Sequence, residues 1–339
     1  MGLASRLAPI EFGERDRAPR LQRWLGLVLS RLLDATIALS FDRTGFRVHA
    51  LAFAPRDLAV DLSDKRCLVT GASSGIGYET ALALAALGAE VSLLSRDSER
   101  GEAAAQRIRE QTGNPNVGFE RLDVSSLASV RAAARRLGKR PVDALVHGAL
   151  VVPTARIETR DALELSWATH VVGPHLLTKL LLPALEKSAD ARVVWASSGG
   201  MYARRLSLDD PNWAARERYD GAVAYAETKR AQVVLAELWA DALRGTTVRV
   251  NAMHPGWADT PALRWSRPGF YRAMRPRLRT PAEGADTAVW LAASPRARAH
   301  TGRLCFDRKP RRTHLLPWTR ESEAQRERLW KLLEATVRP

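Results

Sequence analysis

Short apolar segments alternate with longer segments of helical periodicity between residues 65 and 308. The short segments are rich in valine, leucine and alanine and are bounded by turn residues, as buried strands are. They predict strands at residues 66–70, 90–95, 117–122, 144–147, 192–196, 247–252 and 304–306. The longer segments predict helices at residues 76–87, 98–111, 125–137, 160–187, 222–243 and 280–293. Strands that alternate with helices in this way predict an α/β fold, a Rossmann-type doubly wound parallel sheet in a single domain.

The same pattern divides the chain into an N-terminal extension (residues 1–64), the α/β domain (65–312) and a helical tail (313–339). Within the extension, apolar residues recur at near-helical spacing over residues 21–41 but are interrupted by charges. This predicts an amphipathic helix that is too interrupted to span a bilayer comfortably. Two main roles stay open for it, packing on the main domain or lying on anionic lipid beside flanking arginines, with a spanning segment as a third alternative. The flanking arginines are Arg15, Arg17, Arg20 and Arg43.

Composition adds a strong basic charge. In 339 residues, 52 Lys and Arg stand against 37 Asp and Glu, a formal net charge of +15. The arginines are spread along the whole chain, which favours a general compositional bias, although an anionic partner stays open. No nucleic-acid-reading module is recognised, so a nucleic-acid role is not expected. Cys67 and Cys305 lie in apolar predicted strands, which indicates buried, reduced thiols of a cytoplasmic protein, with membrane association left open.

A glycine-rich turn follows the first predicted strand and opens the first helix of the domain. Its residues are Thr70-Gly71-Ala72-Ser73-Ser74-Gly75-Ile76-Gly77. Glycines let the backbone approach a ligand closely, and the amides at a helix N-terminus bind phosphate. The strand–turn–helix context therefore predicts a dinucleotide pyrophosphate site. Its candidate residues are Gly71, Ser73, Ser74, Gly75, Ile76 and Gly77.

The second predicted strand ends with Ser95, followed by Arg96. A carboxylate at this place would bind the ribose diol of NAD, whereas a hydroxyl and a guanidinium suit the 2′-phosphate of NADP. We therefore expect NADP(H) to be preferred over NAD(H). Asp123, after the third strand, has two open roles: contacting the adenine edge or capping the next helix.

Farther along the chain come Ser197-Ser198, then Tyr225 and Lys229 one helical turn apart, then Pro255-Gly256. A phosphate site followed by these residues in this order indicates a nicotinamide-dependent carbonyl or alcohol oxidoreductase.

These motifs resemble the short-chain dehydrogenase/reductase family over residues 65–312. The family's TGxxxGxG turn is matched at Thr70, Gly71, Gly75 and Gly77, and its Ser–Tyr–Lys set at Ser198, Tyr225 and Lys229. Further strings are similar to the dehydrogenase/reductase family member 12 group, a retinol-dehydrogenase-like branch. These strings occupy residues 197–201, 253–260, 284–287 and 307–310.

The resemblance implies a role for each matched residue. Tyr225 would be the general acid/base, Ser198 would donate a hydrogen bond to the substrate oxygen, and Lys229 would hold the nicotinamide ribose. A free phenol has a pKa near ~10, and the Lys229 ammonium with the positive nicotinamide would favour its phenolate form. Pro255-Gly256 would carry the backbone past the nicotinamide, with Thr260 binding its carboxamide or phosphate.

A cluster of large apolar side chains precedes Thr280, where the family has its substrate lid. The cluster comprises Trp257, Trp265, Phe270, Tyr271 and Met274. It implies a small lipophilic alcohol or carbonyl substrate, while core or partner contacts stay open for the same residues. The family also forms dimers or tetramers through the helix that carries Tyr225, which implies a homo-oligomer.

Two positions depart from the family pattern. The fourth strand ends in His147-Gly148-Ala149-Leu150 where the family has NNAG, and His170 stands where the family has a catalytic asparagine. That asparagine helps to hold a water that relays protons to the lysine. His170 would either extend this relay or mark lost catalysis. An enzyme, a nucleotide-binding sensor or scaffold, and a peripheral membrane protein therefore remain as functional alternatives.

Overall fold

The computed structural model describes residues 37–54 and 56–338. Eight strands form one sheet in the order β3-β2-β1-β4-β5-β6-β7-β8. The strands are β1 (Arg66–Thr70), β2 (Glu90–Ser95), β3 (Val117–Arg121), β4 (Ala144–His147), β5 (Arg192–Ala196), β6 (Arg249–Met253), β7 (Arg303–Phe306) and β8 (Lys309–Arg311). All pairings are parallel except that of β7 with β8. The predicted Rossmann-type α/β fold is confirmed.

The last strand, β8, was not predicted from the sequence. It forms a hairpin with β7 through Asp307 and Arg308, which both have positive φ (49° and 56°). Neither residue is glycine, so the usual sequence signal of such a tight turn is absent. Pro310 lies in β8, and an edge strand is where a sheet tolerates a proline.

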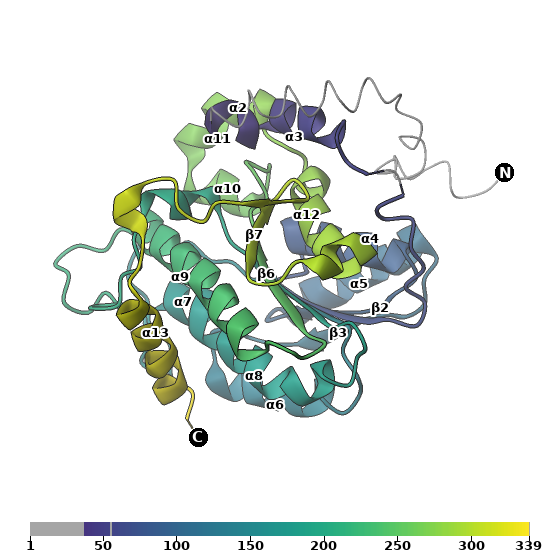
Figure 1. Ribbon diagram of the computed structural model, residues 1–339, viewed down its shortest axis with the longest axis horizontal. Coiled ribbons are helices and arrows are strands. Elements are labelled where there is room, and N and C mark those ends of the chain that lie inside the picture. Colours follow the sequence, from purple (N-terminus) through teal and green to yellow (C-terminus); the bar gives the residue numbers. More distant parts are fainter. Residues whose placement is uncertain (1–36, 55, 339) are drawn as a thin grey trace.

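Helices cover both faces of the sheet (Figure 1). One face is covered by α4 (Gly75–Ala86), α5 (Ser98–Thr112) and α12 (Pro281–Ala293), and the other by α6 (Leu127–Leu137), α8 (Gly173–Leu185) and α9 (Gly221–Ala242). Each helical layer packs on its own apolar cluster. The strand order reverses between β1 and β4, so the connections that leave the carboxyl ends of these neighbours run to opposite faces of the sheet. This is where open α/β sheets bind their ligands.

The long helix predicted over residues 160–187 is wrong in one respect. Residues before Glu164 form a turn in which Ala162 has a φ of 57°, and helix α7 begins only at Leu165 (Leu165–Trp167). A π-helical turn, η3 (Ala168–Val172), then joins α7 to α8. Every residue of the π turn is buried, so the pattern of apolar and polar residues does not indicate that the helix changes type there. Such turns often occur at functional sites.

Two short helices, α2 (Ile37–Phe41) and α3 (Arg43–Ala50), lie over the carboxyl edge of the sheet beside α10 (Pro261–Ser266) and α11 (Pro268–Met274) (Figure 1). Phe41 is buried there, with its ring against His254 and Phe306. Most of the amphipathic helix expected over residues 21–41 lies outside the described residues, and α2 covers only residues 37–41 of that range. Among the helices described, none is both long and apolar enough to cross a membrane.

The C-terminal helix α13 (Glu323–Thr336) packs across the outer surface of α8 and α9. Leu329 and Leu333 are fully buried, and Trp330 contacts the rings of Trp239 and His175. Glu334 bonds to His175 and pairs with a lysine of α8. The surface of the helix that carries Tyr225 is therefore partly covered by the chain's own C-terminus.

Candidate active site

The glycine-rich turn adopts a backbone that larger residues would disturb. Gly71 has a φ of 68°, and a Cβ on it would lie 2.7 Å from Ala149 Cα. A Cβ on Gly77 would lie 2.4 Å from the carbonyl oxygen of Gly71. Gly75 also has a positive φ (59°), but a Cβ there would meet its nearest atom, in Thr260, only at 3.6 Å. Gly77 thus permits close packing within the turn, Gly71 permits close packing against the residues after β4, and Gly75 leaves more room.

Helix α4 begins at this turn without a side-chain cap. Ser74 is its N-cap residue, yet no side-chain hydrogen bond reaches the first amides of the helix. The first amides of a helix lack intrahelical partners and carry its positive dipole end. The turn therefore fits a pyrophosphate, because both its shape and its uncapped amides suit an anion.

A cavity of about 590 Å³ extends from this turn along the carboxyl ends of the strands. It is lined by all the predicted cofactor-binding residues and by Ser198, Tyr225 and Lys229, but not by His170. The tertiary structure thus brings together residues that are spread over 190 positions from Gly71 to Thr260.

At the far end of the cavity from Tyr225, the residues after β2 form a basic corner. Ser95 is buried and donates to the carbonyl of Asp97, while Arg96 is exposed and lines the cavity. Within the described chain no ion pair is recorded for Arg96. Arg100, from the first turn of α5, also lines the cavity and was not predicted. Two guanidinium groups beside a hydroxyl suit a phosphate monoester.

Asp123 does not cap the next helix, and its predicted contact with the adenine edge stays a prediction. One of its carboxylate oxygens accepts from the backbone and the hydroxyl of Ser125, at 3.0 and 2.7 Å, and the residue also lines the cavity. The helix cap itself is Ser126, since α6 begins at Leu127.

Thr70 compensates for the altered motif at the end of β4. Its hydroxyl oxygen accepts hydrogen bonds from the amides of Gly148 and Ala149, at 3.0 and 3.2 Å, and so ties the end of β4 to the glycine-rich turn. His147 points into the core, where it bonds to Thr178 at 2.8 Å and burial lowers its pKa to about 3. The departure at residues 147–150 therefore leaves the joint between β1 and β4 intact.

Ser198 and Tyr225 both line the cavity wall, and Ser198 is near enough to the phenol to shift its pKa. Ser197 instead donates to the carbonyl of Lys229 at 2.8 Å, so Ser198 is the serine that faces the tyrosine. Burial raises the pKa of Tyr225, and the hydroxyl of Ser198 and the charge of Arg267 lower it by less. Burial therefore sets the direction of this shift.

Lys229 is almost completely buried. Its Nζ donates to the carbonyl of Ala196 at 2.8 Å and to Oε1 of Gln232 at 2.9 Å, and lies 5.4 Å from the centroid of the Tyr225 ring. Burial lowers the pKa of Lys229 to about 7. A lysine held in this way carries a charge that depends on pH near neutrality.

His170 lies behind this group, with both ring nitrogens engaged. Nε2 accepts from the amide of Val151 at 3.1 Å, so the ring proton sits on Nδ1, which donates to Thr228 at 2.8 Å. Burial and then the charge of Lys229 hold the pKa of His170 well below its usual value. The ring is neutral and bonds to neither the ammonium nor the phenol, so its geometry does not extend a proton relay.

Comparisons with known proteins agree with this arrangement. A family model described as short chain dehydrogenase matches residues 65–269. Dehydrogenase/reductase SDR family member 12 from Bos taurus is 40% identical over 301 residues, which is 88% of this chain and 94% of the relative. The chain belongs to the short-chain dehydrogenase family. It is an oxidoreductase with a nucleotide-binding Rossmann fold, and its family uses NAD(P)(H).

Other short-chain dehydrogenases extend the comparison. Retinol dehydrogenase 14 from Mus musculus is 33% identical over 80% of this chain and 86% of its own length. A short chain dehydrogenase from Escherichia coli CFT073, solved in complex with NADPH, has a TM-score of 0.59. That structure is 27% identical and covers 73% of this chain and 98% of its own.

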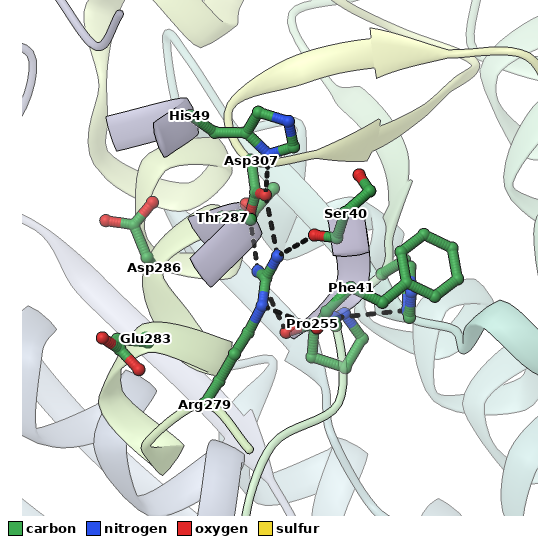
Figure 2. Close-up of polar contacts among 12 residues, drawn as sticks. Ser40, Phe41, His49, Pro255, Arg279, Glu283, Asp286, Thr287 and Asp307 are labelled. Atoms are coloured by element: carbon green, nitrogen blue, oxygen red, sulfur yellow. Dashed lines mark hydrogen bonds and ion pairs between the residues drawn. The ribbon is translucent and has the colours of Figure 1, made fainter. Parts of the chain in front are cut away.

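In this short-chain dehydrogenase, segments outside the residues matched by the family model support the Pro255-Gly256 turn. A Cβ on Gly256, whose φ is 75°, would lie 2.3 Å from Nε of Arg279, so the turn rests directly on that guanidinium. Figure 2 shows the Arg279 guanidinium between Asp307 and the backbone of α2. The guanidinium donates hydrogen bonds to the backbone carbonyls of Ser40 and Phe41, at 2.9 and 3.0 Å. The α2 segment is thus built into the floor of the predicted nicotinamide site.

The predicted lid is only partly a wall of the cavity. Trp257 and Phe270 line it and contact each other at 5.2 Å between ring centroids, whereas Trp265 is 71% exposed. Neither Tyr271 nor Met274 is among the lining residues described. Arg267, from the same lid, does line the cavity near Tyr225 and was missed, because an isolated arginine carries no sequence signal.

Proposed function

We propose that this protein is an NADP(H)-dependent oxidoreductase acting on a lipophilic alcohol or carbonyl compound. The observation that carries the proposal is one continuous cavity lined by the glycine-rich turn and Arg96, which follow β1 and β2, and also by Ser198, which follows β5, and Tyr225 on α9. A dinucleotide that spans the cavity would have its phosphates at the turn and its ring beside Ser198 and Tyr225.

The proposed mechanism assigns proton transfer to Tyr225. Bound NADP(H) supplies or accepts the hydride. In the reducing direction, Tyr225 donates its hydroxyl proton to the substrate oxygen as negative charge develops there. Ser198 donates a second hydrogen bond to the same oxygen, which spreads the developing charge over two donors. In the oxidising direction, Tyr225 takes the proton back.

The raised pKa of Tyr225 suits donation better than abstraction at neutral pH. The Lys229 ammonium at 5.4 Å from the ring would supply positive charge to a phenolate during oxidation. Because the pKa of Lys229 is lowered to about 7, this support weakens as the pH rises above neutrality.

Preference for NADP(H) over NAD(H) rests on the basic corner after β2. Arg96, Arg100 and Ser95 would hold the 2′-phosphate. Arg96→Asp would replace a phosphate ligand by a carboxylate, and we expect the ratio of kcat/KM for NADPH to that for NADH to fall at least tenfold. An unchanged ratio would refute this assignment. Arg109, on α5 and bonded to the carbonyl of Val117, provides the control variant Arg109→Gln.

The substrate class rests on the walls near Tyr225. Leu150, Val151, Val152, Trp257 and Phe270 line the cavity there and favour an apolar body. The retinol dehydrogenases among the relatives support the same class. Peripheral membrane contact through residues 1–60 is a further part of this proposal, and liposome flotation of the full chain against a chain without them tests it.

The decisive experiment is titration with NADPH and NADH, followed by a panel of aldehydes and ketones that includes retinaldehyde. We expect oxidation of NADPH with at least one carbonyl, lost in Tyr225→Phe while NADPH still binds. Binding without turnover on any carbonyl, unchanged by Tyr225→Phe, would favour a nucleotide-binding sensor instead. His170 in place of the family's asparagine is the feature that keeps this second candidate in view.

A further inference from the structure

Gln232 joins Lys229 to His170 through a buried chain of hydrogen bonds. It lies one turn beyond Lys229 on α9, with only 1% of its surface exposed. Its Oε1 accepts from Lys229 Nζ at 2.9 Å, and its Nε2 donates to the backbone carbonyl of His170 at 2.8 Å. Both ends of one side-chain amide are therefore engaged.

The chemistry of the partners fixes the orientation of this amide. An ammonium has no acceptor, so Lys229 must face the amide oxygen. A carbonyl has no donor, so His170 must face the amide nitrogen. If the amide were rotated by half a turn, its nitrogen would face the Lys229 ammonium, which is also a donor, and its oxygen would face the His170 carbonyl, which is also an acceptor.

Pro174 removes one donor that would compete for the carbonyl of His170. In an α-helix this carbonyl would accept from the amide of residue 174, and Pro174 has no N–H. The side chain of His170 is meanwhile held by Val151 and Thr228. The π turn, Pro174 and the two side-chain bonds together present one backbone oxygen to Gln232.

We propose that Gln232 is a positioning residue for Lys229, and that its amide replaces the water that the family uses between the lysine and the residue at position 170. The inference rests on the proposed function for its catalytic consequence. It differs from the family pattern in one respect: the link is a side chain of the protein, held at both ends, and not an exchangeable solvent molecule.

The replacement changes what the link can do. A water can accept a proton on one side and release another on the other side, whereas an amide N–H and an amide oxygen do not exchange roles in this way. Gln232 therefore holds Lys229 without conducting protons away from it. The proton that Tyr225 gives up in each turnover is then replaced from the cavity, which both Tyr225 and Lys229 line.

The test measures the titration of Lys229 directly. The chain has only seven lysines, so labelling lysine with ¹³C at Cε gives few NMR signals, and Lys229→Met identifies the one sought. Gln232→Leu removes the acceptor from the ammonium and should lower the pKa of Lys229. Gln232→Glu places a carboxylate there and should raise it by about 1–3 units. Val233→Ala, a buried apolar change on the neighbouring residue of α9, should leave it unchanged.

The dissociation constant of NADPH, measured by fluorescence, gives a second readout without substrate. We expect it to rise about tenfold or more in Gln232→Leu and to stay within twofold in Val233→Ala, because misplacing a positioned group by about 1 Å has large effects. If Gln232→Leu does not fold, Gln232→Glu keeps the side-chain size and carries the titration alone. An unchanged titration of Lys229 in both Gln232 variants would overturn the inference. Shifted titrations in a protein that reduces no carbonyl would support the inference and count against the proposed function.

Discussion

Replacing Asp307 by asparagine should destabilise the protein strongly, although the residue lies outside the family-matched segment. Asp307 is 1% exposed and forms a bidentate pair with Arg279, with oxygen–nitrogen distances of 2.6 and 2.9 Å. It also bonds to Nδ1 of His49 on α3 at 2.5 Å (Figure 2). In Asp307→Asn the buried Arg279 guanidinium keeps its charge and loses its counter-charge.

Two arguments give the size of the effect. Removing one partner of a buried ion pair usually costs about 3–5 kcal/mol. Independently, burial alone would raise the pKa of Asp307, but the charge of Arg279 and the bonds from His49 and Arg279 lower it from 3.8 to about 2. That difference corresponds to about 2 kcal/mol of stability from the ionised form. The asparagine variant loses more, because its amide nitrogen would also meet the donors of Arg279.

Urea unfolding at pH 7 measures this loss. We expect Asp307→Asn to lower the free energy of unfolding by about 3 kcal/mol or more. Asp209→Asn is the matched control, since Asp209 pairs with Arg328 at 2.7 Å but is 91% exposed, and should lower it by less than about 1 kcal/mol. Equal losses in the two variants would refute the argument that burial makes the Asp307 pair strong.

The pH dependence gives a second check on the same residue. Its folded pKa lies below its unfolded pKa, so the stability it provides is fully present above about pH 4 and is lost as the pH falls toward 2. The wild type should therefore lose stability in this range, and Asp307→Asn should lose less of it. If the free energy of unfolding falls equally with pH in the two proteins, carboxylates other than Asp307 dominate the loss of stability in acid.

Three further predictions concern the lid, the C-terminal helix and the glycine-rich turn. Arg267→Gln removes a positive charge that lowers the pKa of Tyr225, so the pH profile of kcat/KM for alcohol oxidation should move to higher pH. Arg272→Gln, at an exposed position of α11, is the control, and equal pH profiles for the two variants would contradict the role of Arg267. Truncation after residue 320 removes α13 and uncovers Trp239, so the melting temperature should fall by several degrees and light scattering should show self-association. A truncated protein that stays monomeric with an unchanged melting temperature would contradict this prediction. Gly77→Ala places a Cβ 2.4 Å from a backbone oxygen and should weaken NADPH binding at least tenfold, whereas Gly118→Ala, with open space around it, should not.

Local patterns were sufficient for much of the site. The glycine-rich turn depends on backbone geometry over eight consecutive residues, and Tyr225 and Lys229 share a helix face because they are one turn apart. Short-range geometry of this kind can be predicted from the spacing of residues along the chain. The predicted cofactor-binding residues and Ser198, Tyr225 and Lys229 accordingly all line one cavity. His170 is the exception. The sequence placed it near the lysine but did not show which of its groups would face the lysine.

What the sequence by itself determined was the alternation of strands and helices, and with it the edge of the sheet where ligands bind. Only the tertiary structure decided that Arg279 would meet α2, 238 residues earlier in the chain, and that Gln232 would bridge Lys229 and the backbone carbonyl of His170. The physical reason is that these bonds join buried polar groups from distant segments. Each group must find a partner once water is excluded, and packing, not spacing, selects which partner it is.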